Sequence, residues 1–119
     1  MLPKKNRADR KTVEKVFKEG RFVNSPNLSF KYKLIAGLSP TISFTAPKTA
    51  CKRAVGRNLL RRRGYAVLKK CFDQLPSSLV GVFVFGKKSL EVFGGKKTKS
   101  YNPILNLENE IKNILSKIH

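Results

Sequence analysis

The sequence predicts an α+β fold, a two-layer α/β sandwich in which a sheet of about four strands carries helices on one face. Strand-like segments, most of them alternating apolar and polar residues, lie on both sides of a long helical segment. Amphipathic helical segments also lie near both ends of the chain. Because 119 residues of 40% hydrophobic composition suffice for one core, we predict a single domain over residues 1–119.

The first half of the chain predicts a basic arm, one helix and three strands. Residues 1–8 are rich in cations and are expected to form a mobile arm. Apolar residues spaced along one helical face predict a helix over Asp9–Glu19, which Gly20 ends. Strands are expected over three segments, which are Arg21–Val23, Leu28–Leu34 and Thr41–Ala46.

The second half predicts a long helix, a buried strand and a last helix. The long helix is expected from about Lys52 to Phe72, before Pro76. Leu79–Gly86 is apolar on both faces, which suits a central strand. Residues 87–103 are expected to form a basic loop, and the last helix is expected to begin near Asn106.

The charge balance is the strongest indication of function. The chain has 26 Lys and Arg against seven Asp and Glu, a formal net charge of +19. Self-repulsion destabilises such a fold unless a polyanion offsets it, which favours nucleic acid as the partner and makes an anionic membrane surface a distant second. No apolar run reaches the roughly 18 residues of a membrane span, and no apolar segment of a secretory signal follows the N-terminal cations.

The cysteines do not predict a metal site, because nothing near either of them completes one and the one histidine is residue 119. If the long helix is straight, Cys51 and Cys71 lie about 30 Å apart at roughly 1.5 Å per residue. A disulfide requires Cα atoms within about 7 Å of one another. Free thiols and a reducing, cytoplasmic location are therefore expected.

The segment Lys48–Arg63 holds seven cations and no acid. At about 100° per residue, the core-facing stripe of the helix contains Leu60, Gly64, Val67, Leu68 and Cys71. A second, polar face contains Asn58, Arg61, Arg62, Tyr65 and Lys69. Guanidinium groups bind phosphate oxygens and stack on bases, so this face is a candidate RNA-binding surface. The alternative, a solvated charged face, is disfavoured because no acids stand at i, i+4 spacing.

No catalytic group of residues is expected in the chain. An enzyme that hydrolyses nucleic acid with its own side chains gathers carboxylates around Mg²⁺ or uses a pair of histidines. The seven acids are scattered without close spacing, and His119 is alone. Gly94-Gly95-Lys96-Lys97 lacks the spacing of a phosphate-binding loop. We therefore predict no catalytic residue, metal ligand or cofactor in the protein itself.

The basic helix also carries a motif. Residues Ala54–Arg62 read AVGRNLLRR and resemble the signature A-V-x-R-N-x-x-K-R-x-x-R-E of the protein subunit of bacterial ribonuclease P. Further similarity to the family's opening, R-L…D-F-x-x-V-F-K-x-G…S-P, is found at Arg7, at Val13–Gly20 (VEKVFKEG) and at Ser25-Pro26. Ala46-Pro47-Lys48 fits before the signature, and the resemblance covers Arg7 to about Lys88.

This resemblance implies a ribosomal protein S5 domain 2-like sandwich with an unusual left-handed βαβ crossover through the basic helix. It implies that the RNA subunit of the holoenzyme, with Mg²⁺, hydrolyses precursor tRNA and removes the 5′ leader. The protein would bind that RNA and guide the leader through a cleft between the sheet and the N-terminal helix. The expected partners are the catalytic RNA and precursor tRNA, with no membrane and no obligate protein partner.

The charge pattern and the resemblance together assign two sites. The predicted RNA-binding residues are Lys48, Lys52, Arg53, Arg57, Asn58, Arg61, Arg62, Tyr65 and Lys69. The leader-cleft residues, which the resemblance alone implies, are Val13, Phe17, Ser29, Lys31, Lys87 and Lys88. A core position for Phe17 is the open alternative.

The chain departs from the family pattern at five positions: Val13 replaces Phe, Lys31 replaces Tyr, Arg63 an apolar residue, Tyr65 Arg and Ala66 Glu. With Lys31, the cleft is expected to use more charge and less stacking. Gly64 lowers helix propensity by roughly 1 kcal/mol relative to Ala, and a kink or slight rotation there would turn Arg63 outward. The loop 87–103 is longer than expected for the family and receives no role.

Two other functions remain as alternatives. A small ribosomal or RNA-chaperone protein without enzyme activity fits the charge and size equally well. A DNA-binding regulator is disfavoured, because no neighbouring short helix completes a helix-turn-helix frame.

Overall fold

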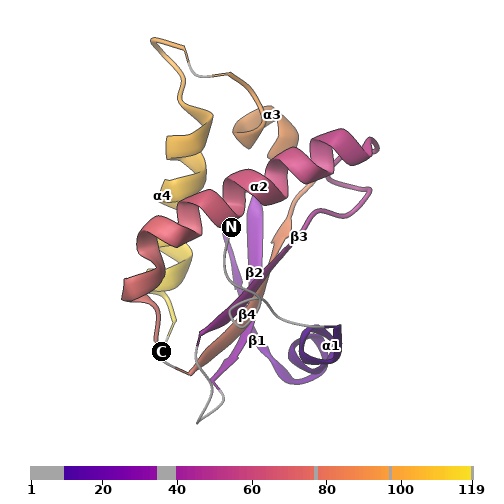
Figure 1. The fold of residues 1–119 in the computed structure, drawn as a ribbon, viewed down its shortest axis with the longest axis vertical. Helices are drawn as coiled ribbons and strands as arrows, with labels where there is room; N and C mark the ends of the chain where they lie inside the picture. The colour runs from indigo at the N-terminus through magenta and orange to yellow at the C-terminus, as the bar shows by residue number, and fades with distance from the viewer. Residues whose placement is uncertain (1–9, 35–39, 77, 97, 119) are drawn as a thin grey trace.

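The computed structural model places one four-stranded sheet between helices (Figure 1). It describes residues 10–34, 40–76, 78–96 and 98–118, so the predicted arm over residues 1–8 and His119 lie outside the described residues. The elements are α1 (Arg10–Glu19), β1 (Arg21–Asn24), β2 (Leu28–Leu34), β3 (Thr41–Thr45), α2 (Ala54–Cys71), the 3₁₀ turn η2 (Phe72–Gln74), β4 (Leu79–Phe85), α3 (Ser89–Phe93) and α4 (Pro103–Ser116).

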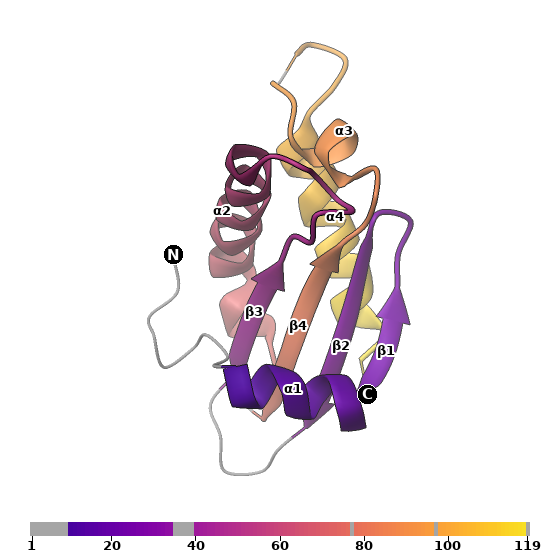
Figure 2. The same ribbon diagram turned by 90° about the vertical axis from the view of Figure 1, so that its right-hand side faces the viewer.

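The strands lie in the order β1-β2-β4-β3, and this mixed sheet confirms the predicted α+β fold. β2 is antiparallel to β1 and β4, whereas β3 and β4 are parallel. In Figure 2 both parallel strands run upward with β4 to the right of β3, and α2, drawn at the left, runs back down on the face of the sheet opposite α1. This path is a left-handed crossover, which is rare because about 98% of such connections are right-handed.

One face of the sheet carries the main core, beneath α2, α3 and α4 (Figure 1). Phenylalanine rings from three strands stack there, with Phe83 of β4 lying 4.2 Å from Phe30 and 4.8 Å from Phe44 between ring centroids. Gly81 makes room for this stack, because a Cβ at that position would lie 2.3 Å from Cζ of Phe30. These rings expose 3% of their surface or less, so their burial contributes a large apolar area to the main core.

The opposite face, which we call the open face, is crossed by α1 near one end of the strands (Figure 2). Val16 of α1 packs there against Val80 and Val82 of β4, and all three are fully buried. Because Leu79, Phe83 and Phe85 face the main core, β4 is covered on both sides, which explains its uninterrupted apolar sequence.

The predicted elements are confirmed, with ends that differ by a few residues, but two features differ more. The segment 87–103 is not simply a loop, because it contains the short helix α3. The last helix begins at Pro103 rather than near Asn106, and Oδ1 of Asn102 accepts the backbone N–H of Leu105 at 3.1 Å. Asn at the N-cap followed by Pro at the first helical position is the signal that predicts this start.

Glu110 of α4 holds the connection between β1 and β2 in place through hydrogen bonds. Its carboxylate accepts hydrogen bonds from Oγ of Ser25 at 2.5 Å and from the backbone N–H and side-chain amide of Asn27 at 2.9 and 3.1 Å. The carbonyl of Asn27 in turn accepts from Oγ of Ser89 at 2.9 Å. These contacts hold α3 and α4 in place against the sheet hairpin.

Candidate nucleic-acid interface

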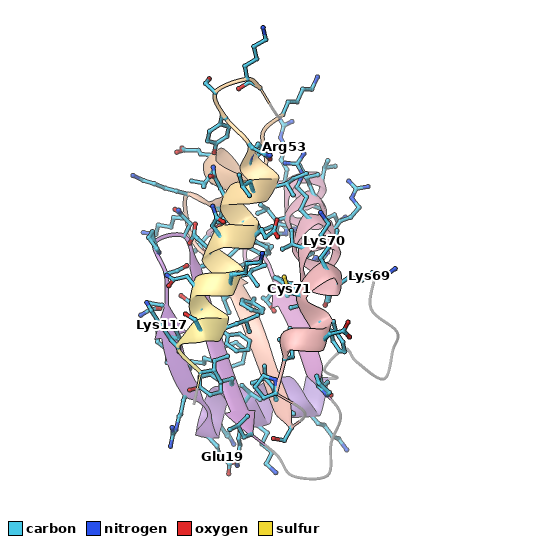
Figure 3. The ribbon with its side chains drawn as sticks, turned by 90° about the vertical axis from the view of Figure 1, so that its left-hand side faces the viewer. Glu19, Arg53, Lys69, Lys70, Cys71 and Lys117 are labelled. Atoms are coloured by element: carbon cyan, nitrogen blue, oxygen red, sulfur yellow. The ribbon has the colours of Figure 1, made fainter. Side chains whose placement is uncertain are left out.

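The outer side of α2 forms a cationic surface, which we call the α2 face. Its exposed polar side chains are Asn58, Arg61, Arg62, Lys69 and Lys70. Figure 3 shows Lys69 on the side of α2 away from α4, whereas Cys71 lies between the two helices. Arg61 donates a hydrogen bond to Oδ1 of Asn58 one turn earlier. No ion pair in the described part of the chain uses a cation of this face.

The start of α2 is braced by Arg57, which is half-buried. Its Nη1 donates to the carbonyls of Cys51 and Lys52 at 3.0 and 2.7 Å. This bracing fixes the segment that holds three exposed cations, which are Lys48, Lys52 and Arg53. Arg57 therefore has a positioning contact in addition to its predicted place among the RNA-binding residues.

The prediction that Tyr65 lies on the polar face is wrong. Only 9% of its surface is exposed, its ring packs edge-on against Phe44 at 5.0 Å, and its hydroxyl oxygen accepts the backbone N–H of Phe44 at 3.2 Å. Phe44 lies in β3, an edge strand, so this hydrogen bond satisfies a backbone donor on the unpaired side of the sheet. The α2 face therefore excludes Tyr65, and it includes exposed Lys70, a cation that the sequence prediction omitted.

The expected outward turn of Arg63 is also wrong, and α2 continues through Gly64 without a break from Ala54 to Cys71. Nη1 of Arg63 donates to the carbonyls of Phe93 and Gly95 at 2.6 and 2.7 Å. Gly64 serves close packing, because a Cβ there would lie 2.6 Å from two ring carbons of Phe44. The departure at residues 63–65 thus joins α2 to β3 and to the segment after α3.

The open face carries a small aromatic and cationic cluster. Nζ of Lys31 lies 5.0 Å from the ring centroid of Phe17 and 5.8 Å from that of Phe22. Phe17 is 40% exposed and Phe22 is 53% exposed, so the core alternative for Phe17 is excluded. Sequence reasoning missed Phe22, although it pairs with Lys31 across β1 and β2 and therefore shares its face.

The other predicted cleft residues extend along the same strands. Ser29 is half-buried, and its Oγ donates to Oδ1 of Asn24 at 2.9 Å. Lys87 and Lys88 are exposed just beyond the end of β4. Since Val82 is the partner of Lys31 and β4 continues to Phe85, Lys87 lies beyond a point about 10 Å farther along, at roughly 3.3 Å per residue. The described cleft residues therefore form a strip along the sheet rather than one pocket, and the side chain of Val13 lies outside the described residues.

Acidic groups are few, and two of those that the structure describes, Glu19 and Glu108, pair with lysines. The carboxylate of Glu19 accepts Nζ of Lys33 at 2.8 Å, and this hydrogen bond together with the lysine charge lowers the pKa of Glu19. Glu108 accepts Lys112 at 3.0 Å and raises the pKa of that lysine. Within the described ranges no three His, Cys, Asp or Glu residues gather into a possible metal site. Cys51 and Cys71 are both free thiols, as predicted.

None of the helices among residues 10–34, 40–76, 78–96 and 98–118 is long and apolar enough to cross a membrane. An exposed arginine-rich helix face, a cation between two exposed rings and a net charge of +19 define the class of a nucleic-acid-binding protein.

The sequence matches the family described as Ribonuclease P over residues 2–118, so the chain belongs to the ribonuclease P protein family. As a member, it is a protein subunit of the ribonuclease P holoenzyme, an endoribonuclease, and the ribonuclease P RNA is its partner. This assignment decides against the ribosomal, chaperone and DNA-binding alternatives.

Solved structures agree on the fold. The chain is similar to the RNase P protein from Thermotoga maritima, with 17% identity, a TM-score of 0.75, and coverage of 89% of this chain and 90% of that one. It is also similar to an RNase P protein structure from Staphylococcus aureus, with 13% identity, a TM-score of 0.72, and coverage of 92% and 90%. A second structure of the Staphylococcus aureus protein gives 14% identity, a TM-score of 0.72, and coverage of 98% and 92%. Comparison with curated protein sequences finds no match.

Proposed function

We propose that this protein docks on the ribonuclease P RNA through the α2 face and binds the 5′ leader of precursor tRNA along the open face. The RNA, with Mg²⁺, would then hydrolyse the phosphodiester bond in the cytoplasm. The observation that carries this proposal is the row of exposed cations on α2, which have no acidic partner in the described part of the chain. Such a row destabilises the free protein and stabilises a complex with a polyanion.

Docking through α2 follows from the chemistry of its side chains. Arg61 and Arg62 present forked guanidinium groups, which match phosphate oxygens and can also stack on bases. Asn58, already oriented by Arg61, offers an amide to a base edge or a 2′-hydroxyl. The helix itself is held rigidly by Tyr65 and by the close approach at Gly64, so the face is preorganised for binding.

Leader binding follows from the open face. Proteins that bind single strands combine aromatic platforms with cations that follow the backbone. Phe17 and Phe22 offer two exposed rings, and Lys31 lies within cation–π distance of both. Lys87 and Lys88 supply charge at the far end of the strip. This arrangement suits a short single-stranded segment of any sequence.

The absence of a carboxylate cluster among the described residues supports a division of labour. Two-metal hydrolysis of a phosphodiester needs ligands that hold Mg²⁺ near the scissile bond. The acids of the described part are Glu14, Glu19, Asp73, Glu91, Glu108 and Glu110, of which Glu19, Glu108 and Glu110 already accept hydrogen bonds within the fold. The metal-dependent step is therefore assigned to the RNA.

The test is reconstitution with the cognate RNA subunit at low Mg²⁺ concentration, with cleavage of precursor tRNA as the readout. The protein should accelerate cleavage, and the double variant Arg61→Ala/Arg62→Ala should lose that effect. Lys117→Ala is the matched control, because Lys117 is exposed at the opposite end of the molecule from Arg53 (Figure 3). Cleavage that is no faster with the protein than without it would refute the proposed function.

A further inference from the structure

We propose that a second RNA-docking point lies between α3 and α4. We call it the basic tip and define it by Lys96, Lys99 and Tyr101. The inference rests on the proposed function and extends it, because the ligand is the phosphate backbone of the same RNA subunit. The basic tip lies outside both the α2 face and the strip of predicted leader-cleft residues along the sheet.

The basic tip is held in a fixed position. The last carbonyls of a helix have no hydrogen-bond donor within the helix, and here side chains from outside α3 donate to them. Arg63 of α2 donates to the carbonyls of Phe93 and Gly95 at 2.6 and 2.7 Å. The hydroxyl of Tyr101 shares its single proton between the carbonyls of Glu91 and Val92, at 3.1 and 2.5 Å. The half-buried guanidinium group of Arg63 therefore helps to fix the position of this segment.

The segment beyond these anchors turns and presents cations. The backbone N–H of Thr98 donates to the carbonyl of Tyr101 at 2.7 Å, which closes a turn that contains Lys99. Lys96 and Lys99 are exposed, and neither forms an ion pair with any residue that the structure describes. Holding two lysines in one short segment without an acid costs free energy in the isolated protein, and a phosphate backbone offsets that cost.

The topology brings the basic tip to the cationic end of the molecule. β3 and β4 are parallel, so their carboxyl ends meet at one edge of the sheet, where α2 begins and α3 follows (Figure 2). Four exposed cations that follow these strands are Lys48, Lys52, Lys87 and Lys88. Leu90 of α3 lies against Gly56 in the first turn of α2, which joins the two regions directly. An RNA that docks on α2 can therefore continue onto the tip.

The chemistry of the tip favours RNA over a protein partner. Tyr101 is 37% exposed with its hydroxyl fixed, so its ring is an oriented platform at the end of the turn that contains Lys99. Ile104 and Leu105, at 40% and 47% exposure, are the neighbouring apolar side chains, and isolated exposed residues of this kind are ordinary on a protein surface. A protein-docking site would need a larger apolar area than these two residues provide.

The test compares the affinity of the full chain for the RNA subunit between about 50 and 200 mM salt. Lys96→Gln/Lys99→Gln should lower the slope of log affinity against log salt by about two, because each lysine would neutralise one phosphate of the RNA. The control Lys112→Gln/Lys117→Gln removes the same charge from α4 and should change the slope much less. If the two double variants behave alike, the basic tip is not a docking point.

Arg63 is the positioning residue, and Arg63→Met tests it without removing a tip lysine. Trypsin should cut this variant faster at Lys96 and Lys99, and the salt slope should fall toward that of Lys96→Gln/Lys99→Gln, with partial recovery in Arg63→Lys. Faster cleavage with an unchanged slope would overturn the proposal. Arg61→Ala/Arg62→Ala distinguishes failure of the basic tip from failure of the proposed function. If this variant weakens RNA binding while the tip variants do not, only the basic tip is refuted. If neither this variant nor the tip variants weaken RNA binding, the proposed function fails as well.

Discussion

Replacing Gly64 with Ala sets two physical effects against each other. In the interior of a helix, Ala is favoured over Gly by roughly 1 kcal/mol, so propensity alone predicts stabilisation. The packing predicts the opposite. A Cβ at position 64 would lie 2.6 Å from Cδ1 and Cε1 of Phe44, whereas carbon atoms in ordinary contact are about 3.5–4.0 Å apart.

The ring of Phe44 has little freedom to move aside. It is 3% exposed, stacked on Phe83 at 4.8 Å and packed against Tyr65 at 5.0 Å. Either α2 or the ring must shift by about 1 Å, and overpacking of this kind typically costs roughly 1–3 kcal/mol. After subtraction of the propensity gain, Gly64→Ala should destabilise the protein by about 1 kcal/mol, which lowers the melting temperature by roughly 4 °C.

Thermal and urea unfolding of Gly64→Ala measure this difference. Ala66→Gly is the control, because residue 66 is exposed on the same helix and should lose only the propensity term of roughly 1 kcal/mol. In the background of Phe44→Leu, which makes space for the new methyl group, Gly64→Ala should become neutral or stabilising. A Gly64→Ala protein that is more stable than the parent would show that the contact between α2 and β3 is not tight.

Three further predictions concern single side chains. Tyr65→Phe leaves the buried N–H of Phe44 without its acceptor and should cost roughly 1–2 kcal/mol of unfolding free energy with unchanged affinity for the RNA subunit; a selective loss of RNA affinity would return Tyr65 to the binding face. Phe17→Ala should reduce affinity for precursor tRNA with a leader but not for tRNA without one. Its cost in unfolding free energy should be far less than the roughly 3–5 kcal/mol lost when a buried Phe is replaced by Ala. A loss of stability of that full size would place Phe17 in the core. Because the pKa of Glu19 is lowered, its contact with Lys33 stabilises the fold above the unfolded pKa of about 4.3, and this stabilisation is lost as pH falls through the lower folded pKa. Glu19→Gln should therefore be less stable than the parent at neutral pH and equally stable in acid. Equal urea midpoints of the two proteins at neutral pH would contradict the ion pair.

Local patterns predicted the fold well. Leu28, Phe30 and Tyr32 alternate with Ser29, Lys31 and Lys33, and the structure buries the first set against the main core. The continuous apolar sequence of β4 likewise indicated a strand covered on both faces. These features depend on side-chain periodicity within a few residues, so the sequence contains them directly.

Contacts between distant segments escaped prediction. Helical periodicity placed Tyr65 among polar neighbours, but its burial depends on the edge of β3, about twenty residues earlier in the chain. Arg63 binds carbonyls that lie 30 and 32 residues away, which no local pattern indicates. For the same reason α3 was missed, since five residues carry too little periodicity and the helix is held by side chains from elsewhere.

The same distinction between local patterns and contacts of distant segments applies to the candidate site. The exposed cations Arg61, Arg62 and Lys69 were predicted because charge and helical position are local properties. Phe22 was missed because its proximity to Lys31 depends on the pairing of β1 with β2. Charge therefore indicated the kind of partner, whereas the pairing of strands determined which rings lie beside the cations.

Docking of the α2 face on the ribonuclease P RNA is tested most directly by the salt dependence of binding. The affinity of the parent protein and of Arg61→Ala/Arg62→Ala for the RNA subunit should be measured between about 50 and 200 mM salt. If each arginine neutralises one phosphate, the variant should bind more weakly, with a slope of log affinity against log salt that is lower by about two. Equal affinity of the two proteins at every salt concentration would contradict the docking and leave α2 as a solvated helix.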